Sequence, residues 1–149
     1  MKNVVLIALS VLFAFPIFAQ MDVVSWSFES ESISDTQYKL TFTADINPGW
    51  YIYSQYLESD EGPIATSLNF TEQVGYKLVE KAEEEGTKVD GYDKIFMMNI
   101  TKYKKQMVIT QIIDVDNKGQ ELDGYVEFMT CNDDQCLPPK TVDFSFYLN

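Results

Sequence analysis

Apolar and polar residues alternate along much of this chain with a period of two. The clearest stretch is residues 39–46, where every second side chain is apolar: Leu40, Phe42, Ala44 and Ile46. This period is typical of a β-strand that buries one face. The turn-forming sequence Asn47-Pro48-Gly49 follows directly and ends the strand.

The same pattern recurs in short segments separated by glycine, proline and asparagine. It predicts about eight or nine strands, at residues 23–28, 39–46, 50–53, 67–71, 76–83, 95–103, 106–115, 124–130 and 142–148. No segment has the apolar spacing of a convincing amphipathic helix. The pattern therefore predicts an all-β chain folded as an antiparallel β-sandwich.

The N-terminus has the features of a secretory signal peptide. Lys2 precedes an apolar run over residues 4–15, and Ala19 offers a small residue before a cleavage site. A retained membrane anchor is the alternative, but the run is shorter than the roughly 20 residues that a membrane span needs. We therefore expect cleavage after Ala19, leaving residues 20–149 as a single exported domain without membrane insertion.

Composition narrows the possible functions of this domain. The chain carries a net charge of −12, which argues against nucleic acid and anionic membranes as partners. It contains no histidine, so a serine–histidine–aspartate triad and a histidine metal site are excluded. No aspartate-rich calcium loop is visible either. We expect a monomer that binds no metal and no cofactor.

The two cysteines, Cys131 and Cys136, are the first candidates for covalent chemistry. They form a C-x4-C motif followed by Leu137, Pro138 and Pro139. In an exported domain the pair could be a structural disulfide. A disulfide that closes a loop of about six residues would add only on the order of 2 kcal/mol to the folding stability. A redox-active pair, in contrast, needs its two sulfurs close together in both the oxidised and the reduced state. The residues alone leave these two roles open.

The loop between the cysteines is acidic. It contains Asp133 and Asp134, and the next basic residue in sequence is Lys140. Carboxylates disfavour a nearby thiolate, so the pKa of each thiol should not be strongly depressed. We expect the reduced pair to react mainly when it is docked on a partner, and a thiol pKa well below about 7 would contradict this.

Three blocks of sequence together carry a resemblance to a known family. The cysteine block is Val126–Pro139, with the sequence VEFMTCNDDQCLPP. A second block, Ala44–Gln55, contains a Pro-Gly-Trp-x-x-Tyr-Ser-like segment, and Gly62–Ser67 follows it. In these blocks and in their order, the chain resembles the N-terminal periplasmic domain of the thiol:disulfide interchange protein DsbD over roughly residues 23–148.

This resemblance implies an immunoglobulin-like fold and a periplasmic location. It implies that the cysteine pair accepts electrons from a thioredoxin-like donor. It then passes them to exported proteins such as disulfide isomerases or cytochrome c maturation proteins. By the family's pattern, Cys136 forms the mixed disulfide with the partner and Cys131 resolves it. Both cysteines are therefore the candidate catalytic residues.

The family also shields its cysteine pair with a cap loop. Residues 86–96 are the equivalent segment here, with Tyr92 and Phe96 as candidate shielding aromatics. Tyr51 and Tyr53 are expected to pack near the pair. Ordinary core packing is the alternative for all four side chains.

Two features depart from the family. Its best-known members have five residues between the cysteines, whereas this sequence has four. They also continue into a membrane-spanning conduit and a thioredoxin-like domain, whereas this sequence ends at Asn149, so a separate electron source is expected. An immunoglobulin-like binding or adhesion module with an inert disulfide remains the alternative function.

Overall fold

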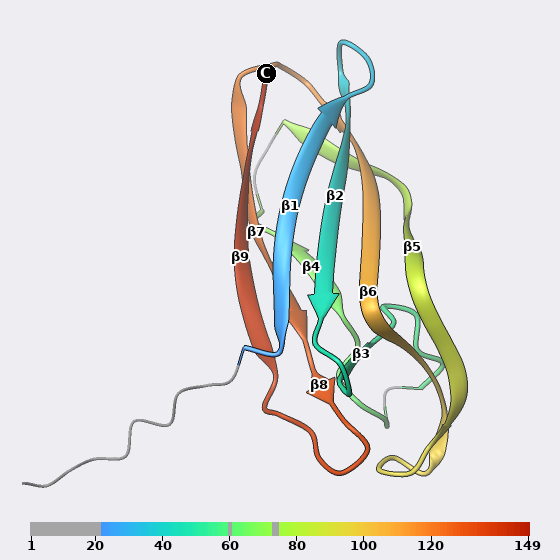
Figure 1. Ribbon diagram of the computed structural model, residues 1–149. Helices are drawn as coiled ribbons and strands as arrows, with labels where there is room; N and C mark the ends of the chain where they lie inside the picture. The colour runs from blue at the N-terminus through green and yellow to red at the C-terminus, as the bar shows by residue number, and fades with distance from the viewer. Residues whose placement is uncertain (1–21, 60, 73–74) are drawn as a thin grey trace, which may run out of the picture.

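Two antiparallel β-sheets face each other in the computed structural model, which describes residues 22–59, 61–72 and 75–149 (Figure 1). The strands are β1 (Val24–Ser32), β2 (Gln37–Ile46), β3 (Tyr51–Tyr53), β4 (Ser67–Phe70), β5 (Tyr76–Asp93), β6 (Met98–Val115), β7 (Gln120–Phe128), β8 (Thr130–Cys131) and β9 (Lys140–Leu148). The described residues form no helix, and so none that could cross a membrane. The predicted signal peptide, residues 1–19, lies outside the described residues. The predicted all-β sandwich is confirmed.

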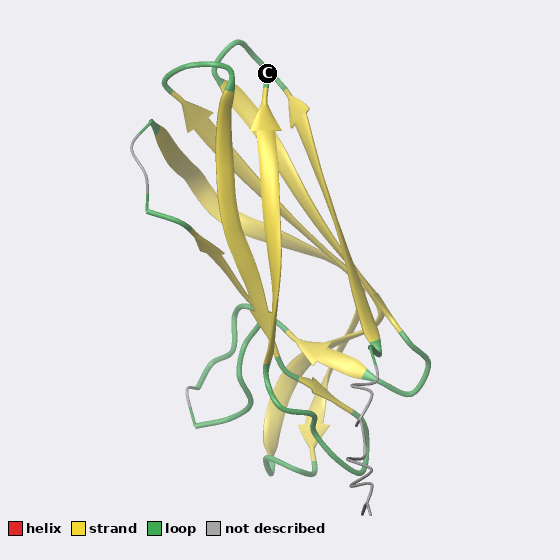
Figure 2. Cartoon of the chain, turned by 90° about the vertical axis from the view of Figure 1, so that its left-hand side faces the viewer, coloured by secondary structure: helices red, strands yellow, loops and turns green. Residues whose placement is uncertain are grey.

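The larger sheet has six strands in the order β1-β2-β6-β3-β8, and β5 pairs with β6. The smaller sheet has the order β4-β7-β9. β1 also approaches β9, so the two sheets come together along that side (Figure 2). Every strand pairing is antiparallel.

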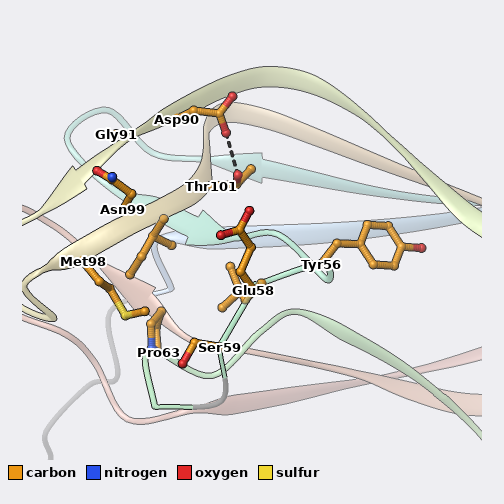
Figure 3. Close-up of a pocket in the computed structure, with 11 residues that line it drawn as sticks. Tyr56, Glu58, Ser59, Pro63, Asp90, Gly91, Met98, Asn99 and Thr101 are labelled. Carbon is orange, nitrogen blue, oxygen red and sulfur yellow. Dashed lines mark hydrogen bonds between the residues drawn. The ribbon is translucent and has the colours of Figure 1, made fainter.

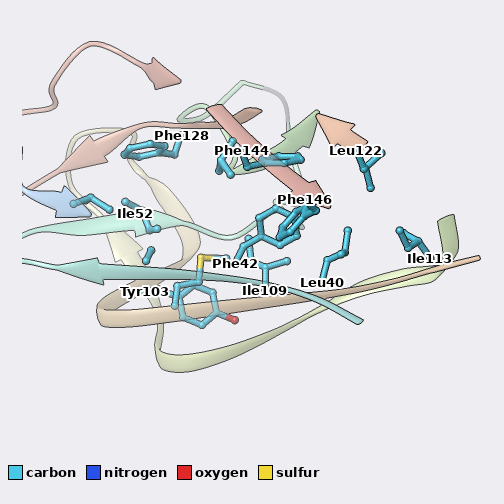
Figure 4. Close-up of a cluster of buried hydrophobic side chains, with 14 of the residues drawn as sticks. Leu40, Phe42, Ile52, Tyr103, Ile109, Ile113, Leu122, Phe128, Phe144 and Phe146 are labelled. Atoms are coloured by element: carbon cyan, nitrogen blue, oxygen red, sulfur yellow. The ribbon is translucent and has the colours of Figure 1, made fainter. Parts of the chain in front are cut away.

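Aromatic and aliphatic side chains fill the space between the two sheets (Figure 4). Alternation along β2 sends Leu40 and Phe42 inward, and both are fully buried. The Phe42 ring meets Phe144 and Phe146 of β9 edge to face, with ring centroids 5.0 and 5.5 Å apart. Such pairs add roughly 0.5–1.5 kcal/mol each beyond the area that they bury. The period-two pattern of the sequence is therefore the direct cause of this core.

The β5–β6 hairpin is longer than the sequence predicted. Residues 95–103 and 106–115 were expected as separate strands, but β6 is continuous, and β5 runs through the predicted cap loop to Asp93. The register shifts between Gly86 and Thr87, opposite Lys105, whose φ is +64°. A β-bulge of this kind bends a strand without ending it, which is why local turn signals suggested a break.

The bend carries the far half of the hairpin beneath the sandwich. There, residues 102–103 of β6 pair with β3, and β3 pairs in turn with β8. In Figure 1 the turn of this hairpin, β3 and β8 all lie at the lower end of the molecule. Tertiary structure thus brings three separate parts of the chain together around the cysteines.

Candidate functional site

The two cysteines form a disulfide at the end of the larger sheet. Cys131 lies in β8, Cys136 follows a short loop, and their Cα atoms are 4.0 Å apart. The Cys131 side chain is fully buried, whereas Cys136 is only half-buried. An incoming thiol therefore has better access to Cys136.

Strand β3 supplies the aromatic surroundings of this disulfide. Tyr51 pairs directly with Cys131 across the β3–β8 ladder. Because side chains alternate along a strand, Tyr51 and Tyr53 both join the cluster around the cysteines, whereas Ile52 points into the main core. Ile100 of β6 completes the buried part of this second cluster, which is separate from the core between the sheets.

Asn132 fixes the shape of the loop between the cysteines. Its side-chain oxygen accepts hydrogen bonds from the backbone N–H groups of Asp134 and Gln135, at 2.9 and 2.8 Å. Its backbone carbonyl accepts a 2.8 Å hydrogen bond from the Tyr51 hydroxyl. Leu137 then donates its N–H to the carbonyl of Thr130 at 2.8 Å. These bonds hold the short loop against β3 and β8.

Asp93 holds the turn of the β5–β6 hairpin over the cluster. Its Oδ1 atom accepts hydrogen bonds from the backbone N–H groups of Ile95 and Phe96, at 2.9 and 3.3 Å. Its Oδ2 atom accepts from the Tyr53 hydroxyl at 3.4 Å. The Phe96 ring meets the Tyr53 ring edge to face, with centroids 6.0 Å apart. One buried carboxylate therefore links the turn to the tyrosine strand.

A buried lysine balances the charge of this carboxylate. Lys102 is 8% exposed, and its Nζ atom lies 3.3 Å from Oδ2 of Asp93. The same ammonium group lies 4.0 Å from the centre of the Tyr51 ring, and Lys104 lies 5.6 Å from it. These are cation–π contacts. The tertiary fold thus brings cations close to the cysteine loop that the linear sequence places far from it.

Both tyrosines of β3 resist ionisation. Burial, followed by the negative charges of Asp93 and Asp133, raises the pKa of Tyr51 to about 12. Burial and the Asp93 carboxylate also raise the pKa of Tyr53. At neutral pH both hydroxyl groups are therefore protonated hydrogen-bond donors.

The structure brings together most of the residues that the sequence singled out. Tyr51, Tyr53 and Phe96 pack in the same cluster as the two cysteines. Tyr92 does not belong to this cluster, and its side chain is 62% exposed. The cap segment itself is the end of an ordered hairpin rather than a loop.

Three further residues of the site were missed from the sequence: Asp93, Lys102 and Asn132. An asparagine directly after Cys131 is a recognisable turn signal, because its side chain bonds to the backbone two and three residues on. Lys102 occupies the same strand face as Ile100, which alternation could have indicated. Asp93 and Lys102 are not opposite each other in the hairpin register, and their ion pair has no signal in the sequence.

A hollow of about 240 Å³ borders the cluster through Met98 and Ile100 (Figure 3). Its wall includes Asp90, whose carboxylate accepts a 2.5 Å hydrogen bond from the Thr101 hydroxyl. No cysteine lines it. Within the described residues, no group of three or more cysteine, aspartate or glutamate side chains is placed to hold a metal ion. The disulfide remains the candidate reactive centre.

Two solved structures share this fold. The N-terminal periplasmic domain of ScsB from Proteus mirabilis matches with a TM-score of 0.57 and 20% sequence identity. The match covers 85% of this chain but only 46% of that one. The N-terminal domain of Neisseria meningitidis DsbD in the reduced form matches with a TM-score of 0.51 and 14% identity, over 83% of this chain and 86% of that one. At these identities the likeness establishes an immunoglobulin-like fold.

Sequence comparison gives the family. No curated protein sequence matches the chain significantly. The family model described as "Thiol:disulfide interchange protein DsbD, N-terminal" matches residues 20–147, which is most of the sequence. With a cysteine pair that forms a disulfide and the shared fold, the chain therefore belongs to the family of DsbD N-terminal domains, a thiol:disulfide interchange module.

Proposed function

We propose that this domain relays electrons through Cys131 and Cys136 in the periplasm, from a thioredoxin-like donor to oxidised exported proteins. Disulfide isomerases and cytochrome c maturation proteins are the expected acceptors. The observation that carries the proposal is the unequal exposure of the two sulfurs. Cys131 is fully buried, and Cys136 is half-buried beside it. This arrangement suits an exchange in which one sulfur meets the partner and the other acts from within.

The chemistry consists of two thiol–disulfide exchanges. A donor thiolate attacks the sulfur of Cys136, forms a mixed disulfide and releases Cys131 as a thiolate that takes up a proton. The donor's second thiol then displaces Cys136, so that two electrons and two protons have been transferred. In the reverse sense, the reduced Cys136 attacks an acceptor disulfide, and Cys131 resolves the mixed disulfide to release a reduced acceptor.

The surroundings of the disulfide support a redox role rather than a structural one. The disulfide joins β8 to the residue that closes a short loop beside it, and it does not connect the two sheets. Its entropic contribution to stability is therefore only about 2 kcal/mol, as expected for a loop of about six residues. Tyr51, Tyr53 and Phe96 pack in the same cluster as the pair, and we propose that they shield it from non-specific oxidants and reductants.

A redox titration tests the central claim. The purified mature domain is equilibrated in glutathione buffers of graded potential, and the free thiols are counted by alkylation and mass spectrometry. A midpoint between roughly −180 and −270 mV supports electron relay. A disulfide that stays oxidised well below about −300 mV supports the alternative of an inert staple in a binding module.

Trapping experiments test the roles of the two cysteines. With Cys131→Ser, the thiolate of Cys136 should attack a thioredoxin-like protein whose single reactive cysteine carries a thionitrobenzoate group, release thionitrobenzoate and leave a stable mixed disulfide. The matched variant Cys136→Ser should form far less, because Cys131 is buried. Equal trapping by both variants would contradict this assignment.

A further inference from the structure

The far half of the β5–β6 hairpin differs in charge from the rest of the protein. Residues 87–105 contain five lysines and two aspartates, a net charge of +3, whereas the whole chain carries −12. Within the described residues, Lys94 and Lys104 have no ion-pair partner. Lys104 lies over the Tyr51 ring, beside the cysteine loop. A positive region therefore lies next to the disulfide on an otherwise acidic molecule.

The turn of the same hairpin exposes large apolar side chains. Tyr92, Ile95 and Met97 are 62%, 40% and 74% exposed. None of the three belongs to either buried cluster. Met97 also has a φ of +55°, a conformation that side-chain-bearing residues rarely adopt. Large apolar side chains that are exposed together at one end of a hairpin, tyrosine and methionine among them, are typical of surfaces that contact another protein.

This apolar turn lies directly beside the cysteine loop. A cavity of about 200 Å³ separates them, and its lining includes Tyr92 and Ile95 from the turn and Asp133 from the loop. Tyr51, which pairs with Cys131, lines it as well. A mixed disulfide brings the Cα atoms of its two cysteines within about 7 Å. A protein joined to Cys136 must therefore cover neighbouring surface, and the turn lies within its reach.

We propose that Tyr92, Ile95 and Met97, flanked by Lys94 and Lys104, form the docking surface for the redox partner. The inference rests on the proposed function, and it adds the kind of partner: a thioredoxin-like protein whose reactive cysteine lies in an apolar surface rimmed by acidic residues. The lysines attract that rim and speed the encounter. The apolar turn then fills the partner's surface next to its cysteine. Tyr92 acts here as a contact residue rather than a shield.

The test compares protein and small-molecule reductants. Two reduced thioredoxins, one of net negative and one of net positive charge, and dithiothreitol each reduce the oxidised domain under pseudo-first-order conditions. We expect the acidic thioredoxin to react faster, and added salt to slow it. Lys94→Glu with Lys104→Glu should reduce its rate about tenfold or more. Tyr92→Ser with Met97→Ser should also slow it several-fold.

Matched controls come from the opposite end of the molecule. Tyr147 is 62% exposed, the same as Tyr92, and Lys118 lies in an exposed ion pair. Tyr147→Ser and Lys118→Glu should leave all rates unchanged. No variant should change the dithiothreitol rate more than about twofold, because that reagent needs no docking surface.

The outcomes separate this inference from the proposed function. Patch variants that react with the acidic thioredoxin as fast as the controls would overturn the docking surface, as would a faster reaction of the basic thioredoxin. If dithiothreitol reduces the Lys94/Lys104 or the Tyr92/Met97 double variant faster than it reduces the wild type, the turn only shields the disulfide. Sedimentation that shows a dimer in the wild type and a monomer in the patch variants would assign the surface to self-association instead. Failure of the proposed function would give a different result: neither the thioredoxins nor dithiothreitol would reduce the wild-type disulfide at potentials of roughly −180 to −270 mV.

Discussion

Removing the Asp93 carboxylate should destabilise the domain more than any exposed charge change. Asp93 is 1% exposed, and four groups donate hydrogen bonds to it: two backbone N–H groups of the turn, the Tyr53 hydroxyl and the Lys102 ammonium. Asp93→Ala leaves the ammonium buried without its counter-charge. The expected loss is about 3–5 kcal/mol of unfolding free energy, the usual result of breaking a buried ion pair on one side.

The converse change should cost less. In Lys102→Met the carboxylate keeps its three other donors, so we expect a loss of about 1–3 kcal/mol. At an effective dielectric constant of about 20, unit charges 3.3 Å apart attract by roughly 5 kcal/mol, and desolvation of both groups offsets much of this attraction. The loss of unfolding free energy in the double variant should therefore be smaller than the sum of the two single losses by about 2 kcal/mol or more.

Urea denaturation of the oxidised protein, followed by tryptophan fluorescence, measures each step of this double-mutant cycle. If Asp93→Ala does not fold, Asp93→Asn removes the charge while keeping the shape of the side chain. The exposed cross-strand pair of Glu31 and Lys39 serves as the control, and its coupling should be below about 1 kcal/mol. A coupling between Asp93 and Lys102 that is as small as the control would refute the reasoning.

Three further predictions concern the backbone, the tyrosines and the shield. Gly86→Ala should cost about 2 kcal/mol or more in urea denaturation, because φ is +132° and a Cβ would lie 2.3 Å from a backbone oxygen. Gly91→Ala, with nothing within 4 Å, should change stability by less than about 0.5 kcal/mol. Burial raises the pKa of Tyr51 to about 12, so above pH 10 the unfolded chain ionises first and stability falls toward pH 12. Tyr51→Phe should make that fall shallower, and an unchanged slope would contradict the shift. Phe96→Ala should speed reduction by dithiothreitol about fivefold or more, whereas Tyr92→Ala should not; equal rates would argue against shielding by Phe96.

The regular part of the fold was predictable because its signal is local. Alternation at Leu40 and Phe42 specifies which face of β2 is buried, and the structure has both fully buried. The hairpin was harder. The bulge at Gly86 and Lys105 bends two long strands without ending them, and sequence patterns record turn-forming residues without showing whether the chain reverses there.

The candidate site divides in the same way. The spacing of Cys131 and Cys136, and the aromatic strand from Tyr51 to Tyr53, were visible as motifs and were matched to a family. The pairing of Asp93 with Lys102 was not visible, because the two residues are not opposite each other in the hairpin: Asp93 pairs with Met98, and Lys102 pairs with Val89. The exposure of Tyr92 was also hidden, since an aromatic residue in a strand reads the same whether it shields a site or faces solvent.

The sequence by itself therefore determined the fold class, the candidate cysteine pair and the family, because each is encoded by short-range periodicity or by a contiguous motif. Only the tertiary structure decided which sulfur is accessible and which residues surround it. It also placed lysines beside an acidic cysteine loop and set an apolar turn next to the disulfide. These properties arise where β3, β8 and the far half of the β5–β6 hairpin meet, and contacts between residues so distant in sequence are set by strand register and by the bend at the bulge.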